Sequence, residues 1–391
     1  MSAENLRERV LSCLPEAEFL VSAPGRVNLI GEHVDYNAGI VLPVAIDRRV
    51  WISVKPLTEK RLCICTLDLD DEVEIDLKNL DSKEDMSGNP LPFWSYYPTA
   101  VAWAFQMHHL PLKGLKACIA SNLSMQAGLS SSAALEVAFA LAFQNIAGLS
   151  MERMQLAQLC QLAECGFVGV QCGLMDQFAV SHGVARYALY FDTRSLAWQP
   201  IPLPPETSLV IADSGKKRTL ANSAYNQRRQ ECQQAVELLT EIDASIQSLR
   251  DVDINTFKKY QEQLPKKVAM RALHVIKEID RVKQSVLFLE DDDAKSFGQT
   301  MFESHRSLRD LYEVSCQELD FLVETAAELP SCWGAKLTGA GFGGCTVNLV
   351  KRDQAEQFCD QLQNAYFARF GVALKTYQCQ ADRGAYVEII R

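Results

Sequence analysis

The chain of 391 residues lacks an excess of positive charge, a long apolar run and a leader-like N-terminus. Its formal net charge is -10, whereas proteins that bind nucleic acids or membrane surfaces usually carry basic faces. We therefore expect neither nucleic acid nor a membrane as a partner. The apolar run at residues 133–143 contains Glu136 and is too short to span a bilayer. Charged residues such as Glu4, Arg7 and Arg9 lead us to expect no signal peptide.

Cysteine is plentiful, but the spacing of the 13 cysteines lacks the pattern of a zinc site. Most lie in apolar contexts, as Cys118, Cys160 and Cys345 do. Cys63 and Cys65 are the closest pair, and no second pair or histidine cluster in the sequence completes a zinc site. The composition predicts reduced, buried thiols in a cytoplasmic protein.

Common nucleotide-binding motifs are missing as well. No G-x-x-x-x-G-K-[ST] segment occurs, which excludes a P-loop NTPase. Gly339, Gly341 and Gly344 match G-x-G-x-x-G, but residues 345–350 are apolar and β-branched. A dinucleotide-binding turn leads into a helix, and this turn is predicted to lead into a strand. No H-R-D or D-F-G follows, so a protein-kinase glycine loop is excluded too.

The order of predicted elements favours an α+β fold with two domains. Strand-like segments with Gly, Pro and Asn turns dominate residues 19–77, and helices are predicted at 98–108, 131–147 and 150–167, the last with Ser150 as N-cap. Strands follow near 188–192 and 208–213, then long amphipathic helices to about residue 329, then strands at 334–337 and 345–350, a helix and a terminal strand. The proline-rich residues 200–205 are the candidate boundary, giving domains 1–203 and 204–391.

A glycine and three serines precede the helix predicted at residues 131–147. Gly128 permits a tight turn. The serines Ser130 to Ser132 are favoured at a helix N-cap, where side chains accept hydrogen bonds from backbone N–H groups. A helix start also offers free N–H donors and the positive end of the helix dipole, which suits a phosphate. From this segment alone, plain capping is the favoured interpretation.

Residues 26–37 gather a cation, two carboxylates, an imidazole and an amide: Arg26, Glu32, Asp35, His33 and Asn37. This density suits a ligand with many hydroxyls, because each unpaired polar group in a pocket is costly. A polar surface loop after a strand is an equally good interpretation.

Asp176 stands just after a glycine-containing turn, between Met175 and Gln177. We expect its carboxylate to be partly buried, where an arginine partner would keep it ionised. Capping of the helix that follows is the commoner role for an aspartate after glycine.

Four segments together resemble galactokinases, members of the superfamily named for galactokinase, homoserine kinase, mevalonate kinase and phosphomevalonate kinase. They are S-A-P-G-R-V-N-L-I-G-E-H-V-D-Y-N at residues 22–37, G-L-S-S-S-A at 128–133, C-G-L-M-D-Q-F at 172–178 and T-G-A-G-F-G-G-C at 338–345. The resemblance covers nearly the whole chain. It implies an N-terminal domain like ribosomal protein S5 domain 2, a C-terminal α+β domain related to the ferredoxin-like fold, and a site between them.

The resemblance also implies residue roles. Asp176 corresponds to the aspartate that faces the anomeric hydroxyl of the sugar, with Arg26 beside it. The implied sugar-binding positions are Glu32, His33, Asp35, Gly173 and Tyr225. The implied ATP-binding positions are Gly128, Leu129, Ser130, Ser131, Ser132, Trp94, Gly341, Gly343 and Gly344. Ser132 and Glu164 match the ligands of Mg²⁺, the implied cofactor.

The implied activity is an ATP-dependent kinase that makes α-D-galactose 1-phosphate in the cytoplasm, with a monomer favoured. Asp176 would act as a general base or mainly orient the hydroxyl, and the sequence leaves both open. One alternative is a kinase of the same superfamily for N-acetylgalactosamine or arabinose. Another is a regulator that binds galactose and ATP without turnover, against which the intact serine loop, Asp176 and Arg26 argue.

One segment departs from the family pattern, which has P-x-G-x-G-L before the serines. Here Ser124 and Gln126 occupy the positions of the proline and the first glycine. Either Gln126 lies outside the nucleotide contacts, or its amide replaces a backbone contact. We favour the first interpretation, because Gly128 and the serines can form the anion seat without it.

Overall fold

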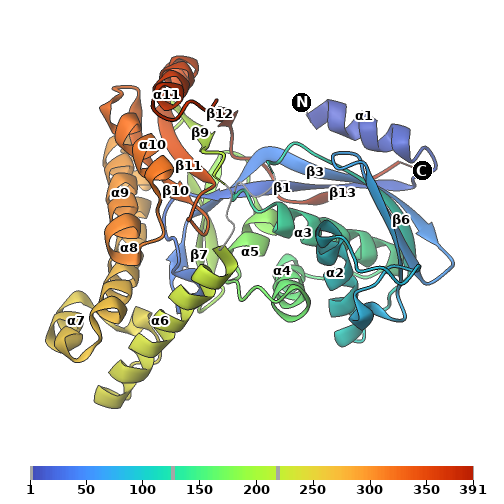
Figure 1. Cartoon of the computed structure of the whole chain (residues 1–391), viewed down its shortest axis with the longest axis horizontal. Coiled ribbons are helices and arrows are strands. Elements are labelled where there is room, and N and C mark those ends of the chain that lie inside the picture. The colour runs from blue at the N-terminus through green and yellow to red at the C-terminus, as the bar shows by residue number, and fades with distance from the viewer. Residues whose placement is uncertain (1–2, 125–127, 217–220, 391) are drawn as a thin grey trace.

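The computed structural model describes residues 3–124, 128–216 and 221–390 (Figure 1). A six-stranded sheet forms the first half of the molecule, with every neighbouring pair antiparallel except β4 and β6. Its strands, in spatial order, are β13 (Tyr386–Ile389), β1 (Phe19–Asn28), β3 (Pro43–Leu57), β6 (Gly114–Ser121), β4 (Arg61–Thr66) and β5 (Asp71–Asp76).

Helices cover both faces of this sheet. On one face lies α1 (Ala3–Cys13). Packed on the other are α3 (Ser131–Ala147) and α5 (Met175–His182), and on the same side α2 (Tyr96–Met107) and α4 (Arg153–Ala163) pack against these helices (Figure 1). Alternating strand residues explain the two layers, because successive side chains point to opposite faces of a sheet.

The helix predicted at 131–147 has these bounds in the structure and ends at Gly148, whose φ of 69° is left-handed. The prediction for 150–167 is wrong at its start. Glu152, not Ser150, is the N-cap of α4, because its side chain and that of Gln155 form a capping box. The last residues of that prediction form a π-helical turn, η4 (Glu164–Val168).

The second half of the molecule is built around a four-stranded antiparallel sheet. Its order is β10 (Cys332–Thr338), β11 (Cys345–Lys351), β9 (Thr207–Asp213) and β12 (Lys375–Cys379). The accompanying helices are α6 (Ala221–Ile242), α7 (Ile254–Tyr260), α8 (Lys266–Glu290), α9 (Ala294–Ser307), α10 (Gln317–Glu328) and α11 (Ala355–Phe370). A small sheet of β2 (Ile40–Val41), β7 (Tyr187–Asp192) and β8 (Trp198–Pro202) lies between the two halves (Figure 1).

The mixed order of helices and sheets predicted from the sequence is confirmed. The predicted boundary at residues 203 and 204 falls between β8 and β9 and stays a prediction. The final strand crosses back, since β13 pairs with β1 at the edge of the first sheet.

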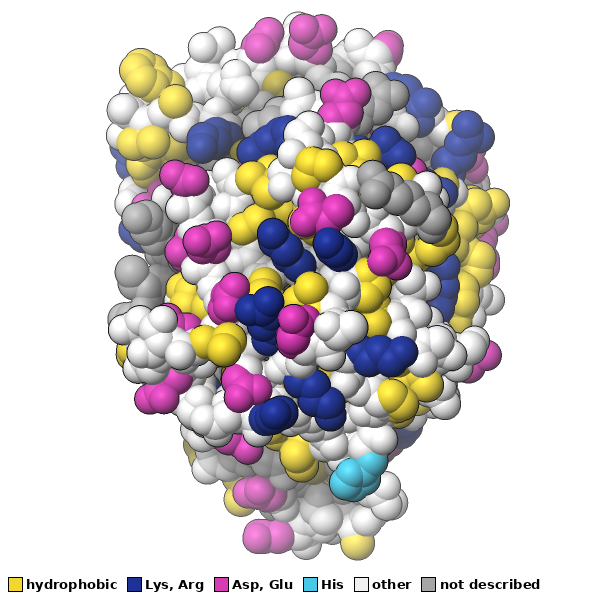
Figure 2. All heavy atoms as spheres, turned by 90° about the vertical axis from the view of Figure 1, so that its right-hand side faces the viewer, with side chains coloured by type: hydrophobic (Ala, Val, Ile, Leu, Met, Phe, Trp, Pro, Cys, Tyr) yellow, Lys and Arg dark blue, Asp and Glu magenta, His cyan; other side chains and the backbone are white. Residues whose placement is uncertain are grey.

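Within the described residues, no helix is long and apolar enough to cross a membrane. Figure 2 shows one face of the molecule, on which cationic and anionic side chains are interspersed rather than gathered by sign.

Candidate active site

Arg26 and Asp176 form the centre of the site. Arg26 lies on β1 beside an irregularity in its pairing with β3, and its Nε and Nη2 donate to the two oxygens of Asp176 at 2.8 and 2.6 Å. The arginine is buried, whereas 28% of the Asp176 side chain is exposed. Asp176 does not cap α5, whose N-cap position is Leu174. The carboxylate is therefore fixed on one side and open to a ligand on the other.

The serine loop is attached to this pair. Ser130 Oγ donates to Asp176 Oδ2 at 2.5 Å, and Arg26 Nη1 donates to the carbonyl of Gly128 at 2.7 Å. The close approach of the serine loop to β1 requires glycine at position 25, because a Cβ on Gly25 would lie 2.7 Å from the carbonyl oxygen of Leu129. The loop and the aspartate thus form one connected unit.

Plain capping, favoured from the segment alone, is wrong for Ser130. The residue occupies the N-cap position of α3 with a left-handed φ of 55°, and its hydroxyl is directed at Asp176. In the described part of the chain, no side chain caps this helix start. The first N–H groups of α3, near the half-buried Ser131 and Ser132, are therefore free to bind an anion.

Asp35 and Gly173 are brought together beside Asp176. A Cβ on Gly173 would lie 1.9 Å from Asp35 Oδ2, so only glycine leaves room for this carboxylate. Burial, and then the charge of Asp176, raises the pKa of Asp35 to about 7. Tyr225 of α6 completes this wall, with its ring centroid 5.6 Å from that of His33.

The two ring nitrogens of His33 are engaged differently. Its Nδ1 is 2.8 Å from the hydroxyl of Tyr36, which in turn is 2.8 Å from the hydroxyl of Tyr312. The buried Nε2 makes no hydrogen bond of normal geometry to the described residues, although the backbone of Ala340 interacts with the ring and raises its pKa against the effect of burial. Burial, together with the nearby His274, lowers the pKa of His33 to about 3, so the ring is neutral. A neutral imidazole whose second nitrogen lacks a regular hydrogen bond suits a hydroxyl ligand.

Glu32 is engaged differently from the other predicted sugar-binding residues. Its Oε1 accepts from the ammonium of Lys336 at 2.9 Å and from the N–H of Gly339 at 3.0 Å. Both ends of the ion pair are buried. Glu32 therefore ties the loop after β1 to β10 and to the start of the glycine-rich loop. Sequence reasoning missed Lys336, a lone cation in an otherwise apolar strand.

Two buried carboxylates lie behind the serine loop. The side-chain amide of Gln177 donates to Glu164 Oε2 at 2.7 Å and to Glu136 Oε2 at 3.0 Å. Burial raises the pKa of Glu136 well above its ordinary value and, with the charge of Asp176, raises that of Glu164 to about 7. Sequence reasoning missed this role for Glu136, whose signal was a charged residue inside an apolar helix.

This cluster fits a hard cation. Over the described ranges, neither Glu164 nor Glu136 has a cationic partner, and Glu136 Oε1 is buried without a hydrogen bond. Ser132 lies four residues before Glu136 and therefore on the same face of α3. Hydroxyl and carboxylate oxygens are the donors that Mg²⁺ prefers.

The glycine-rich loop connects β10 to β11, which confirms the predicted strand after it. Gly341 has a φ of 75°, and a Cβ there would lie 2.2 Å from the carbonyl oxygen of Val314. Gly343 similarly contacts Lys216, and the Gly344 carbonyl accepts from Ser214 Oγ at 2.7 Å. The loop is thus held between the chain that follows β9 and the chain that follows the π-helical turn η7 (Leu308–Tyr312).

Trp94, Ser124 and Gln126 are the residues singled out from the sequence that have not yet been described. Trp94 donates its Nε1–H to Asp71 at 2.8 Å, and its place near adenine stays a prediction. Ser124 Oγ is 2.8 Å from the hydroxyl of Tyr377. Gln126 lies outside the described residues.

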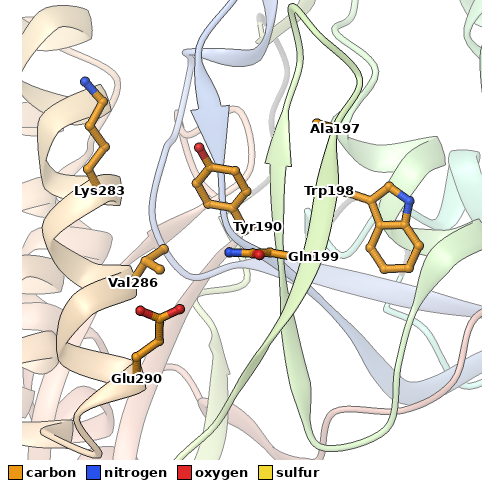
Figure 3. A pocket seen from close by; sticks show the side chains of 7 residues that line it. All are labelled: Tyr190, Ala197, Trp198, Gln199, Lys283, Val286 and Glu290. Atoms are coloured by element: carbon orange, nitrogen blue, oxygen red, sulfur yellow. The ribbon is translucent and has the colours of Figure 1, made fainter.

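A surface hollow of about 390 Å³ lies elsewhere, between the β7–β8 hairpin and α8. Figure 3 shows Tyr190 and Gln199 pointing toward α8, whereas Trp198 points away from it. None of the predicted site residues is among its lining residues.

Three family models match the chain. The galactokinase galactose-binding signature covers residues 13–56, the N-terminal domain of GHMP kinases covers 96–184, and their C-terminal domain covers 285–368. The solved mevalonate kinase of Methanococcus jannaschii shares the fold, with a TM-score of 0.66 at 18% identity over 94% of this chain and 99% of that one. The matched family models, together with the shared fold, place the chain among the small-molecule kinases of this class.

Within that class the chain belongs to the galactokinase family. It is 46% identical to a galactokinase of Roseiflexus sp. and 40% identical to one of Chloroflexus aurantiacus, each over 93% of this chain and 92% of the relative. The crystal structure of Lactococcus lactis galactokinase complexed with galactose matches with a TM-score of 0.91 at 30% identity, over 98% of this chain and 99% of that one.

Proposed function

We propose that the protein is a galactokinase that transfers the γ-phosphoryl group of ATP to the C1 hydroxyl of α-D-galactose, giving α-D-galactose 1-phosphate and ADP. The observation that carries this proposal is the Arg26–Asp176 pair, joined by Ser130 to the free N–H groups of a helix start. This arrangement places a carboxylate that can bind a hydroxyl beside N–H groups that can bind a phosphate. Both are needed to bring a sugar hydroxyl and a phosphate together.

Asp176 would accept a hydrogen bond from the C1 hydroxyl on its exposed side. Arg26 holds both carboxylate oxygens, which fixes the orientation of the carboxylate. Asp176 would then either orient the hydroxyl or accept its proton. Arg26 and the start of α3 would stabilise the charge that spreads over the phosphoryl oxygens during transfer.

Gly128, Leu129, Ser130, Ser131 and Ser132 would hold the ATP phosphates, with Gly341, Gly343 and Gly344 supporting them and Trp94 near the adenine. Ser132 and Glu164 would hold Mg²⁺. When bound, the ion compensates the charge of the phosphates. Glu136 and Gln177 would keep Glu164 in place.

Glu32, His33, Asp35, Gly173 and Tyr225 are proposed as the sugar-binding positions. Nε2 of His33 and the Asp35 carboxylate support direct contacts with hydroxyls. Glu32 supports the pocket by fixing the chain between β1 and the glycine-rich loop.

The finer assignments follow from the same resemblance. We propose an N-terminal domain of the ribosomal protein S5 domain 2 type at residues 1–203, and a C-terminal domain related to the ferredoxin-like fold at 204–391. We also propose a cytoplasmic monomer.

A coupled ADP-release assay tests the function with ATP, magnesium and a panel of galactose, N-acetylgalactosamine and arabinose. The proposal predicts galactose-dependent ADP release by the wild type and its loss in Asp176→Asn. ADP release with N-acetylgalactosamine or arabinose, but not with galactose, would indicate a kinase for another sugar. Binding of galactose and ATP without release would indicate a regulator.

A further inference from the structure

Three cysteines from three different elements meet on the face of the first sheet that α1 covers. Cys13 ends α1, Cys65 lies in β4 and Cys118 in β6. Their sulfur atoms all lie within 4.8 Å of one another, and those of Cys13 and Cys65 are 3.5 Å apart. The sequence pairs Cys65 with Cys63, but the structure groups it with two distant thiols instead.

The fold fixes this arrangement on two sides. Cys65 and Cys118 are directly paired residues of the parallel strands β4 and β6, so the sheet register sets their separation. Leu14 and Ala17, which follow α1, pack against Cys118 and hold the end of the helix over the strands. Cys118 is buried, Cys65 half-buried and Cys13 exposed, which leaves a path from solvent to the cluster.

The spacing has the dimensions of a metal–thiolate site. Thiolates bind zinc at about 2.3 Å with tetrahedral geometry, which places ligand sulfurs about 3.8 Å apart. Soft thiolate ligands select zinc or Cu(I) over hard cations. We propose that Cys13, Cys65 and Cys118 form a three-thiolate site for a soft cation such as zinc, with water as the fourth ligand.

Metal binding at this cluster is a matter of proton release alone. The three thiols lose their protons to solvent when their sulfurs bind the metal, and no electron is transferred. Lys116 offsets part of the remaining negative charge.

Cys63 provides a matched control. It lies two residues before Cys65 on the same strand and therefore on the same face of the sheet, yet it is outside the cluster. Its neighbours are Glu74 on β5 and Lys116 on β6, its partners in the sheet register.

The test is a zinc titration of the full chain against a chromophoric chelator, with a phosphine reductant present. The wild type and Cys63→Ser should bind one zinc ion with equal affinity. Cys65→Ser and Cys13→Ser should each weaken binding by at least about tenfold, because each lacks one of the three ligands. Cobalt as a probe should give sulfur-to-metal charge-transfer absorption only in the first two proteins.

Thermal unfolding and activity separate a metal site from a folding defect. Zinc should raise the Tm of the wild type and of Cys63→Ser but not that of Cys65→Ser, and galactose turnover by Cys65→Ser should match the wild type. Equal zinc affinity in the wild type and Cys65→Ser would overturn the proposal. The proposal would also be overturned if the reduced wild type bound no zinc and oxidation of the protein gave only a Cys13–Cys65 disulfide.

Discussion

Asp176 is surrounded by donors from two other parts of the chain, and its chemistry depends on them. Arg26 and Ser130 lie 150 and 46 positions away from Asp176 in the sequence, so no local sequence pattern predicts these two contacts. The sequence suggested the partner of Asp176 only as a class of residue, an arginine. From its own segment alone, Ser130 is interpreted as a helix cap, because that is the usual role of a serine at a helix start. In the structure its hydroxyl donates to Asp176 instead.

Replacing Asp176 with asparagine keeps the size of the side chain and removes its charge. We expect Asp176→Asn to lower kcat by about 10²- to 10⁴-fold, the range typical of a lost acid–base group. ATP binding, measured by calorimetry, should persist because the serine loop and α3 remain. A variant with nearly normal kcat would show that the aspartate serves only to position Arg26.

The carboxyl of Asp35 makes stability depend on pH. Its pKa in the folded chain is raised from 3.8 to about 7, mainly by burial. The folded state therefore binds this proton more tightly than the unfolded state, and the carboxyl costs stability progressively as pH rises from about 4 to about 7. Asp35→Asn should be stabilised relative to the wild type at pH ~8, and the difference should shrink toward pH ~4. Urea unfolding at several pH values checks this, and a difference independent of pH would contradict it.

Glu164 is the residue on which the metal assignment rests. Glu164→Gln should raise the magnesium concentration for half-maximal rate by about tenfold or more, since even indirect partners of metal ligands change affinity 10- to 100-fold. Glu303→Gln, an exposed glutamate of α9, is the control and should leave the titration unchanged. If both variants titrate like the wild type, Glu164 belongs to helix structure alone.

Among the helices and strands, local sequence patterns predicted where helices form but not every helix start or every strand pairing. The bounds of α3 followed from apolar spacing and Gly148, which adopts the left-handed conformation that ends helices. The start of α4 did not follow, because serine is a preferred N-cap type and Ser150 was the natural choice. In the structure the N-cap is Glu152, which forms a capping box with Gln155. The return of β13 to β1 is a pairing between the two ends of the chain that no local pattern encodes.

The ion pair between Lys336 and Glu32 joins β10 to the loop after β1. Because both groups are buried, Lys336→Met leaves an uncompensated carboxylate and should destabilise the protein by about 3–5 kcal/mol. Lys283→Met is the control, since Lys283 forms an exposed pair with Asp280 on α8 and should change little. Chemical denaturation measures both. Equal unfolding midpoints would mean that the loop is held by its other contacts.

At the scale of the molecule, the site draws on both halves of the chain. Arg26, Ser130 and Asp176 come from the first half, and Tyr225 and Lys336 from the second (Figure 1). The family motifs had predicted roles for Arg26, Ser130 and Asp176, because these residues fall within the matched segments, and those roles stay predictions. Lys336 and Glu136 belong to no such motif, and their roles became visible only from their buried contacts.

We expect this site to recognise galactose by the arrangement of its hydroxyl groups. The direct measurement is kcat/KM for galactose against its C4 epimer glucose, with ATP and magnesium held constant. Mispairing one buried hydroxyl costs about 1–3 kcal/mol, so galactose should be favoured by about ten- to a hundredfold or more. Equal kcat/KM values for the two sugars would show that the site does not distinguish their hydroxyl groups.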